Sequence, residues 1–137
     1  MQRDWSTNMN TIAIGTILIL SLLLNGCESE SDRIQKRIKR TEKKERVFAG
    51  FMVVLEGMQE DTRVLKARSE RIASANYMLA RLEEVKEEAK EVGYIKKWEL
   101  LKKAVLAYRA AAETNNQAYV NDAKRYLEEF GAEKLPE

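Results

Sequence analysis

The hydrophobic positions of this chain follow two patterns, a continuous apolar run near the N-terminus and helical spacing after it. From Trp5 to Cys27 no side chain is charged, and the run from Ile12 to Leu24 is almost wholly apolar. After Cys27, apolar residues recur three and four positions apart with charged residues between them. This spacing is typical of helices that bury one face. We therefore expect an all-α protein, an elongated helical hairpin or a small three- to four-helix bundle, after an N-terminal hydrophobic signal or anchor helix.

The most apolar stretch after Cys27 runs from Val47 to Met58. At about ten residues it is too short to cross a bilayer, so we expect either a core segment or a face that binds a partner. The residues predicted to form this packing or partner face are Phe48, Phe51, Met52, Leu55 and Met58.

Two glycines interrupt this stretch seven residues apart, Gly50 and Gly57, and so lie on nearly the same helix face. Their missing side chains would let another backbone approach closely, or they would only weaken the helix by about 1 kcal/mol each. Gly57 is also a candidate kink or turn, with Asp61 or Thr62 as the cap of the next helix.

Three further helices are predicted from the spacing, over residues 65–92, 94–112 and 119–130, and the second of these folds back antiparallel on the first. Gly93 marks the end of the first, because glycine readily adopts the left-handed conformation that closes helices. The polar residues 114–116 can cap the helices on either side, and Gly131 closes the last one.

The apolar run near the N-terminus has the size of a signal-peptide core. Its densest part is about 13 residues, short of the roughly 20 needed by a spanning helix. It ends with Leu24-Asn25-Gly26-Cys27, which resembles the lipobox of bacterial lipoproteins over residues 10–27. The resemblance implies cleavage between Gly26 and Cys27 and attachment of diacylglycerol to the Cys27 thiol, with a further acyl chain such as palmitate on the new amine. Two or three acyl chains, at about 0.8 kcal/mol per buried CH₂, form a stable anchor.

This interpretation divides the chain into a signal peptide over 1–26, a lipidated cysteine with a basic stalk over 27–46, and a helical domain over 47–137. It places the protein in the cell envelope, anchored by lipid. Outer-membrane attachment on the periplasmic face is the default, because Glu28 replaces the aspartate that favours retention at the inner membrane in this family.

An uncleaved membrane helix is the alternative for the same segment. The uncharged stretch from Trp5 to Cys27 could cross a thin bilayer, and translation could begin at Met9. Such a single-pass tether with a periplasmic coiled coil would be similar to phage inner-membrane spanins. Charge gives opposing signals for export: Glu28, Glu30 and Asp32 after the cysteine favour it, whereas the positive-inside rule, applied strictly, would keep the basic run that begins at Arg33 in the cytoplasm.

A basic segment follows Cys27 closely, although the whole chain carries a net charge of only +2. That near balance disfavours a nucleic-acid partner. Beside a lipid anchor, the basic side chains could contact anionic headgroups, each contributing about 1 kcal/mol, or they could simply be solvated. The candidate residues are Arg33, Lys36, Arg37, Lys39, Arg40, Lys43 and Lys44.

Catalytic chemistry has little support, because the chain contains no histidine and only one cysteine. The carboxylate pairs Glu83-Glu84, Glu87-Glu88 and Glu128-Glu129 are adjacent in sequence, so their side chains point in different directions on a helix. We therefore expect no enzyme activity, metal, cofactor or small-molecule substrate. The expected partners are a membrane, through the lipid anchor, and another envelope protein or a second copy of this chain.

Overall fold

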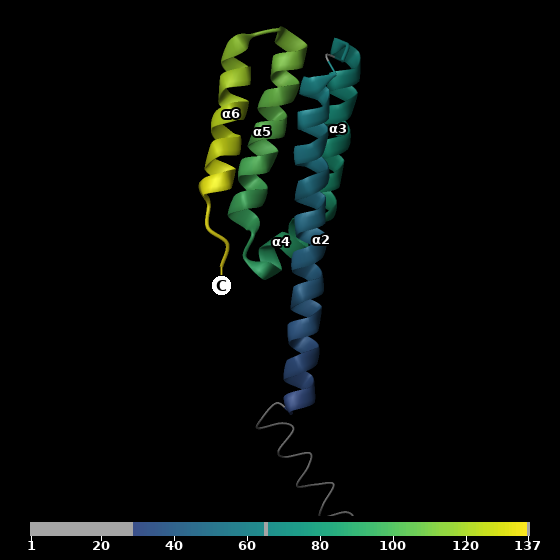
Figure 1. Ribbon diagram of the computed structural model, residues 1–137, viewed down its shortest axis with the longest axis vertical. Coiled ribbons are helices and arrows are strands. Elements are labelled where there is room, and N and C mark those ends of the chain that lie inside the picture. Colours follow the sequence, from purple (N-terminus) through teal and green to yellow (C-terminus); the bar gives the residue numbers. More distant parts are fainter. Residues whose placement is uncertain (1–28, 65, 137) are drawn as a thin grey trace, which may run out of the picture. The chain divides into compact units, whose positions relative to one another are not determined.

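The computed structural model describes residues 29–64 and 66–136, and within these ranges all regular secondary structure is helical (Figure 1). The helices are α2 (Glu30–Arg63), α3 (Arg68–Glu84), α4 (Lys86–Val92), α5 (Ile95–Thr114) and α6 (Gln117–Ala132). The all-α class is confirmed. None of the helices in the described ranges is long and apolar enough to span a membrane. The predicted N-terminal hydrophobic helix lies outside them.

Contacts divide the chain into two compact units, residues 1–39 and 40–137, and the second holds the later part of α2 and the helices α3 to α6. In this unit α5 packs against α6 on one side and against α3 on the other, and α4 also contacts α5. Figure 1 shows α3 and α5 running in opposite directions, as predicted from the sequence. Each long helix contributes side chains to the core, which therefore resembles that of a helical bundle.

The second half of α2 forms one wall of this core through residues spaced four, three and four apart. These residues are Val47, Phe51, Val54 and Met58, all buried. The helix continues through Gly57 without a break, so a turn there and the cap at Asp61 or Thr62 are wrong. Asp61 instead lies inside the helix on its buried face, and Thr62 donates its hydroxyl hydrogen to the Met58 carbonyl at 2.6 Å.

A single helix was predicted over 65–92, but two helices separated by Val85 occupy this range. The Leu82 carbonyl, in the last turn of α3, accepts a hydrogen bond from the Trp98 indole nitrogen at 2.6 Å and another from the Val85 amide at 3.2 Å. In a continuous helix this carbonyl would accept the amide four residues later. Here the Trp98 indole and the Val85 amide take the place of that donor. The break therefore depends on a tryptophan of the next long helix, which local spacing does not reveal.

Glycine and asparagine end the helices where the sequence predicted. Gly93 follows α4 with φ of 81°, and the amides of Gly93 and Tyr94 donate to the Lys90 and Ala89 carbonyls, the bonding pattern of a Schellman cap. Asn115 ends α5 in the left-handed conformation, and Asn116 caps α6 by accepting the Ala118 amide at 3.0 Å.

The C-terminal end of α6 differs slightly from the prediction. Gly131 does not close this helix, because α6 continues to Ala132.

Side chains of the α3 region lie close to α2 at two glycines. A Cβ atom at Gly50 would lie 3.2 and 3.3 Å from the two methyl groups of Val85, and one at Gly57 would lie 2.9 Å from the terminal methyl of Met78. These separations are tighter than ordinary van der Waals contact. The atoms that approach these glycines belong to the side chains of Val85 and Met78 rather than to another backbone, and the tighter fit against a stiff side chain is at Gly50.

Replacement of Gly50 by leucine should destabilise the protein by about 1–3 kcal/mol, because the added side chain overpacks against Val85. The matched control is Gly131→Leu, since a Cβ there meets nothing within 4 Å, and it should be neutral or slightly stabilising. Urea unfolding of both variants measures the difference. Adding Val85→Ala should recover part of the loss in the Gly50 variant only, and equal effects at both glycines would contradict the close approach.

Candidate functional site

The predicted lipidation and cleavage residues, Cys27 and Gly26, lie outside the described residues. The basic residues predicted to contact a membrane, Arg33 to Lys44, all lie on α2. Lys43 forms an ion pair with Glu91, and Arg46, just beyond that set, pairs with Glu88 at 2.9 Å. These pairs connect α2 with α4, so both cations already have a partner within the protein. Both pairs are largely exposed and contribute little to stability.

The predicted packing face between Val47 and Met58 divides into an inner and an outer side. Phe51 and Met58 are buried, Met52 and Leu55 are partly buried, and Phe48 is 54% exposed. Phe51 meets Phe130 of α6 edge to face, with ring centroids 5.6 Å apart. Most of this stretch is therefore covered by the chain itself, and Phe48 is the large side chain that it leaves on the surface.

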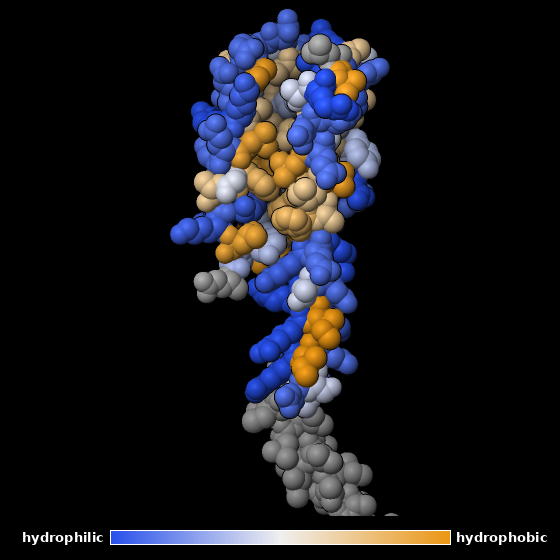
Figure 2. Space-filling model, in the orientation of Figure 1, coloured by the Kyte–Doolittle hydropathy of each residue, from blue (hydrophilic) through white to orange (hydrophobic). Residues whose placement is uncertain are grey.

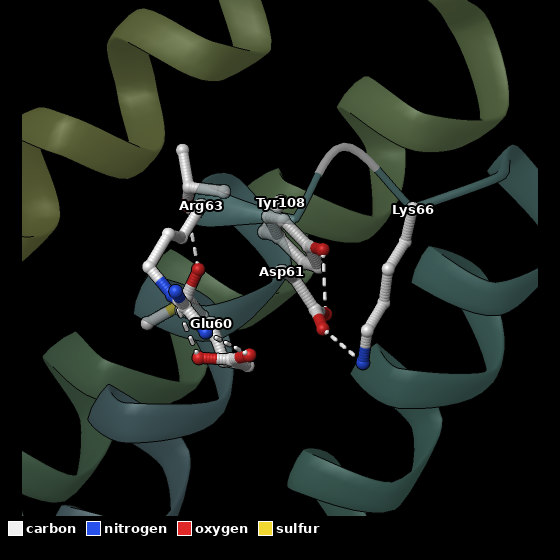
Figure 3. Close-up of polar contacts among 7 residues, drawn as sticks. Glu60, Asp61, Arg63, Lys66 and Tyr108 are labelled. Atoms are coloured by element: carbon white, nitrogen blue, oxygen red, sulfur yellow. Dashed lines mark hydrogen bonds and ion pairs between the residues drawn. The ribbon is translucent and has the colours of Figure 1, made fainter.

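A buried carboxylate continues the inner side of this face. Asp61 is only 2% exposed and follows Met58 by three residues, the spacing of the same helix face. The Tyr108 hydroxyl of α5 donates to its Oδ2 at 2.7 Å, and the Lys66 ammonium lies 2.8 Å from its Oδ1. Figure 3 shows the Asp61 carboxylate between these two groups, while the exposed pair of Glu60 and Arg63 lies to one side. The carboxylate is thus bound by groups from two other segments.

The protonation of these groups follows from their surroundings. Burial by itself would raise the pKa of Asp61, but hydrogen bonds with Lys66, Ser74 and Tyr108 outweigh it and hold that pKa below its ordinary value. Burial and the bond to Asp61 raise the pKa of Tyr108. At neutral pH the aspartate is therefore charged and the tyrosine is neutral.

A cavity of about 330 Å³ lies next to this cluster, between the ends of the long helices. Its apolar walls are Met58 of α2, Ala111 of α5, and Val120, Ala123 and Leu127 of α6. Figure 2 shows apolar side chains on the face between α6 and α2, in the upper half of the view. The volume falls at the lower end of the roughly 300–1,000 Å³ usual for small-molecule sites.

Three cations line the same cavity, Lys66, Arg71 of α3 and Lys124 of α6. Lys66 is paired with Asp61. Within residues 29–64 and 66–136, Arg71 and Lys124 form no ion pair, and the buried Nε of Arg71 has no hydrogen-bond partner. The lining therefore carries an excess of positive charge over apolar walls.

This arrangement is suited to binding rather than to proton transfer. A general base needs a pKa near the working pH, but Asp61 holds its proton less readily than usual, and Tyr108 releases its proton less readily. In the described part of the chain, no group of three or more His, Cys, Asp or Glu side chains could hold a metal ion. What the described residues present in this cavity is a set of cations over apolar walls.

Sequence reasoning assigned none of Asp61, Lys66, Arg71, Tyr108 and Lys124 to this cavity. One signal was present, because the spacing of the buried face of α2 continues from Met58 to Asp61 and thus places a carboxylate at a core position. The others come from different segments of the chain, and only their packing brings them to one cavity.

The pH dependence of stability should reveal the bond between Tyr108 and Asp61. Because the folded pKa of Tyr108 lies above its unfolded value, its contribution is fully present below pH about 10 and is lost as pH rises further. Tyr108→Phe should cost about 1.5–3 kcal/mol at pH 8, and the difference from wild type should shrink above pH 10.

The readout is the free energy of unfolding from urea titrations between pH 7 and 11. Tyr77→Phe is the matched control, because Tyr77 is 60% exposed, and it should follow the wild-type curve. A pH-independent difference between wild type and Tyr108→Phe would contradict the bond to a charged aspartate.

Comparison of this chain with protein-family models, with curated proteins and with solved structures finds no match. No relative therefore supplies a role or a ligand for the cavity. The proposals below rest on the residues of this chain, and on the resemblance of residues 10–27 to a lipoprotein leader.

Proposed function

We propose that this chain is a bacterial lipoprotein of the cell envelope, held to a membrane by lipid on Cys27, whose helical body serves as a non-catalytic interaction protein. The observation that carries the proposal is the position of the only cysteine, directly after the apolar run and Leu24-Asn25-Gly26. A thiol at that position is where lipoprotein processing needs one. Acyl chains on this residue would supply the anchor.

The helical body supports a binding role. Its long helices bury a shared core of their own, and the chain has no histidine for acid–base work. The basic residues that follow the anchor, from Arg33 to Lys44, would lie near the membrane surface and be attracted to anionic headgroups. A partner would be another envelope protein or a second copy of this chain.

Metabolic labelling with radiolabelled palmitate tests the anchor. Wild type expressed in a bacterial host should incorporate the label and Cys27→Ser should lose it, because the thiol is the site of the first acylation. The double variant Cys27→Ser with Ser29→Cys is the matched control, since it restores a thiol two residues later, outside the lipobox, and should stay unlabelled. Label retained in Cys27→Ser would overturn the proposal.

Mass spectrometry of the membrane-extracted protein separates cleavage from an uncleaved tether. An acylated N-terminus at Cys27 supports the lipoprotein. An intact chain from Met1 or Met9 without acyl groups would instead favour a single-pass tether, the alternative that the uncharged stretch from Trp5 to Cys27 supports.

A further inference from the structure

The cavity beside Asp61 combines three features that point to one class of ligand. Its walls are mainly apolar, its volume is about 330 Å³, and its cations outnumber its carboxylates. Asp61 is the acidic residue in the lining; Lys66 forms an ion pair with its Oδ1, and Tyr108 donates a hydrogen bond to its Oδ2. The remaining cations, Arg71 and Lys124, thus face an apolar space without an anion in the described part of the chain.

Arg71 brings an unpartnered donor to the cavity lining. Its Nε is buried and has no hydrogen-bond acceptor, although buried polar groups in folded proteins are nearly always satisfied. A guanidinium presents its N–H groups as a planar fork that matches a carboxylate. An anion at this position would satisfy the buried donor.

The volume limits the apolar part of the ligand. At about 30 Å³ per water-sized group, the cavity holds roughly ten such groups, which is one alkyl chain of medium length. A peptide helix or both chains of a phospholipid would need more room. Met58, Val120 and Leu127 would contact the alkyl chain, because they form the apolar walls.

We propose that this cavity binds a free medium-chain fatty acid, with its carboxylate against Arg71 and Lys124 and its alkyl chain between α2, α5 and α6. Asp61 is the positioning residue of the site. Its ion pair with Lys66 at 2.8 Å balances that cation, and its hydrogen bond from Tyr108 at 2.7 Å fixes the tyrosine beside the cavity. The site is independent of the lipid anchor at Cys27.

Photo-crosslinking with a diazirine-bearing C10 fatty acid tests the proposal on the full chain in phospholipid nanodiscs. The crosslinks, located by mass spectrometry, should concentrate in the peptides covering 108–127, and unlabelled decanoate should displace them. The corresponding C10 alcohol, which lacks the anion, should label these peptides about tenfold less. Equal labelling by acid and alcohol, or labelling spread evenly over the chain, would overturn the proposal.

Two variants test the contribution of each positive charge to binding separately from the stability of the fold. Arg71→Gln and Lys124→Gln should each lower labelling by the acid several-fold, and labelling by the alcohol should stay unchanged. Lys134→Gln removes the same charge from an exposed residue outside the cavity, and it should behave as wild type. Circular dichroism shows whether each variant is folded, and if one is not, the test rests on the other. Unchanged labelling by the acid in the folded variants would overturn the proposal.

Two further arms distinguish the source of the ligand and the role of the cavity. A phosphatidylglycerol analogue with the same diazirine on its acyl chain should not label residues 108–127, whereas labelling equal to that by the free acid would assign the site to membrane lipid instead. Ala111→Leu fills the cavity and should abolish labelling by acid and alcohol alike. Persistent labelling in this variant would place the bound alkyl chain elsewhere.

Cys27→Ser should leave labelling of residues 108–127 unchanged, so failure of the proposed anchor and failure of this site can be told apart.

Discussion

The close contact between the second half of α2 and the α3 region determines much of this structure. Val47, Phe51 and Val54 are fully or almost fully buried, and this burial brings α2 so near its neighbour that Gly50 lies against Val85. Each buried aliphatic or aromatic side chain contributes about 1.5–3 kcal/mol relative to exposure. A large side chain at position 50 would overpack against Val85 and would disturb these contacts together. The glycine that lowers helix propensity is therefore the residue that permits the packing.

The same helix face carries a carboxylate into the protein, which has consequences for the site. An unpaired buried charge is costly, and Asp61 avoids this cost through Tyr108 and Lys66. These partners come from α5 and from the connection before α3, so the ionic cluster also holds three segments together. The cavity beside it remains because the small residues Ala111 and Ala123 do not fill the space between α5 and α6. Packing, charge and cavity thus depend on one another at this end of the core.

The proposed activities of the chain belong to separate regions. The proposed anchor depends on Cys27 and on the leader before it, and the proposed ligand site depends on residues from Met58 onward. The basic segment lies between them in the sequence. Two of its cations already form ion pairs within the protein, Lys43 with Glu91 and Arg46 with Glu88. These ion pairs are solvent-exposed, so salt screens them and they add little to the fold.

The sequence by itself determined the helical class and the helix ends at Gly93 and Asn115, because helical spacing and cap residues act within a few positions of the chain. Of the face predicted on α2 it identified Phe51 and Met58 as packing residues, whereas Val47 and Val54 complete the buried face and Phe48 is exposed. It did not determine the break at Val85, which depends on a hydrogen bond from Trp98, or the role of Asp61, which had looked like a helix cap. Only the tertiary structure decided these features and the cavity. The residues that form each of these features are separated by many positions in the sequence. The distances between their side chains therefore depend on how the helices pack.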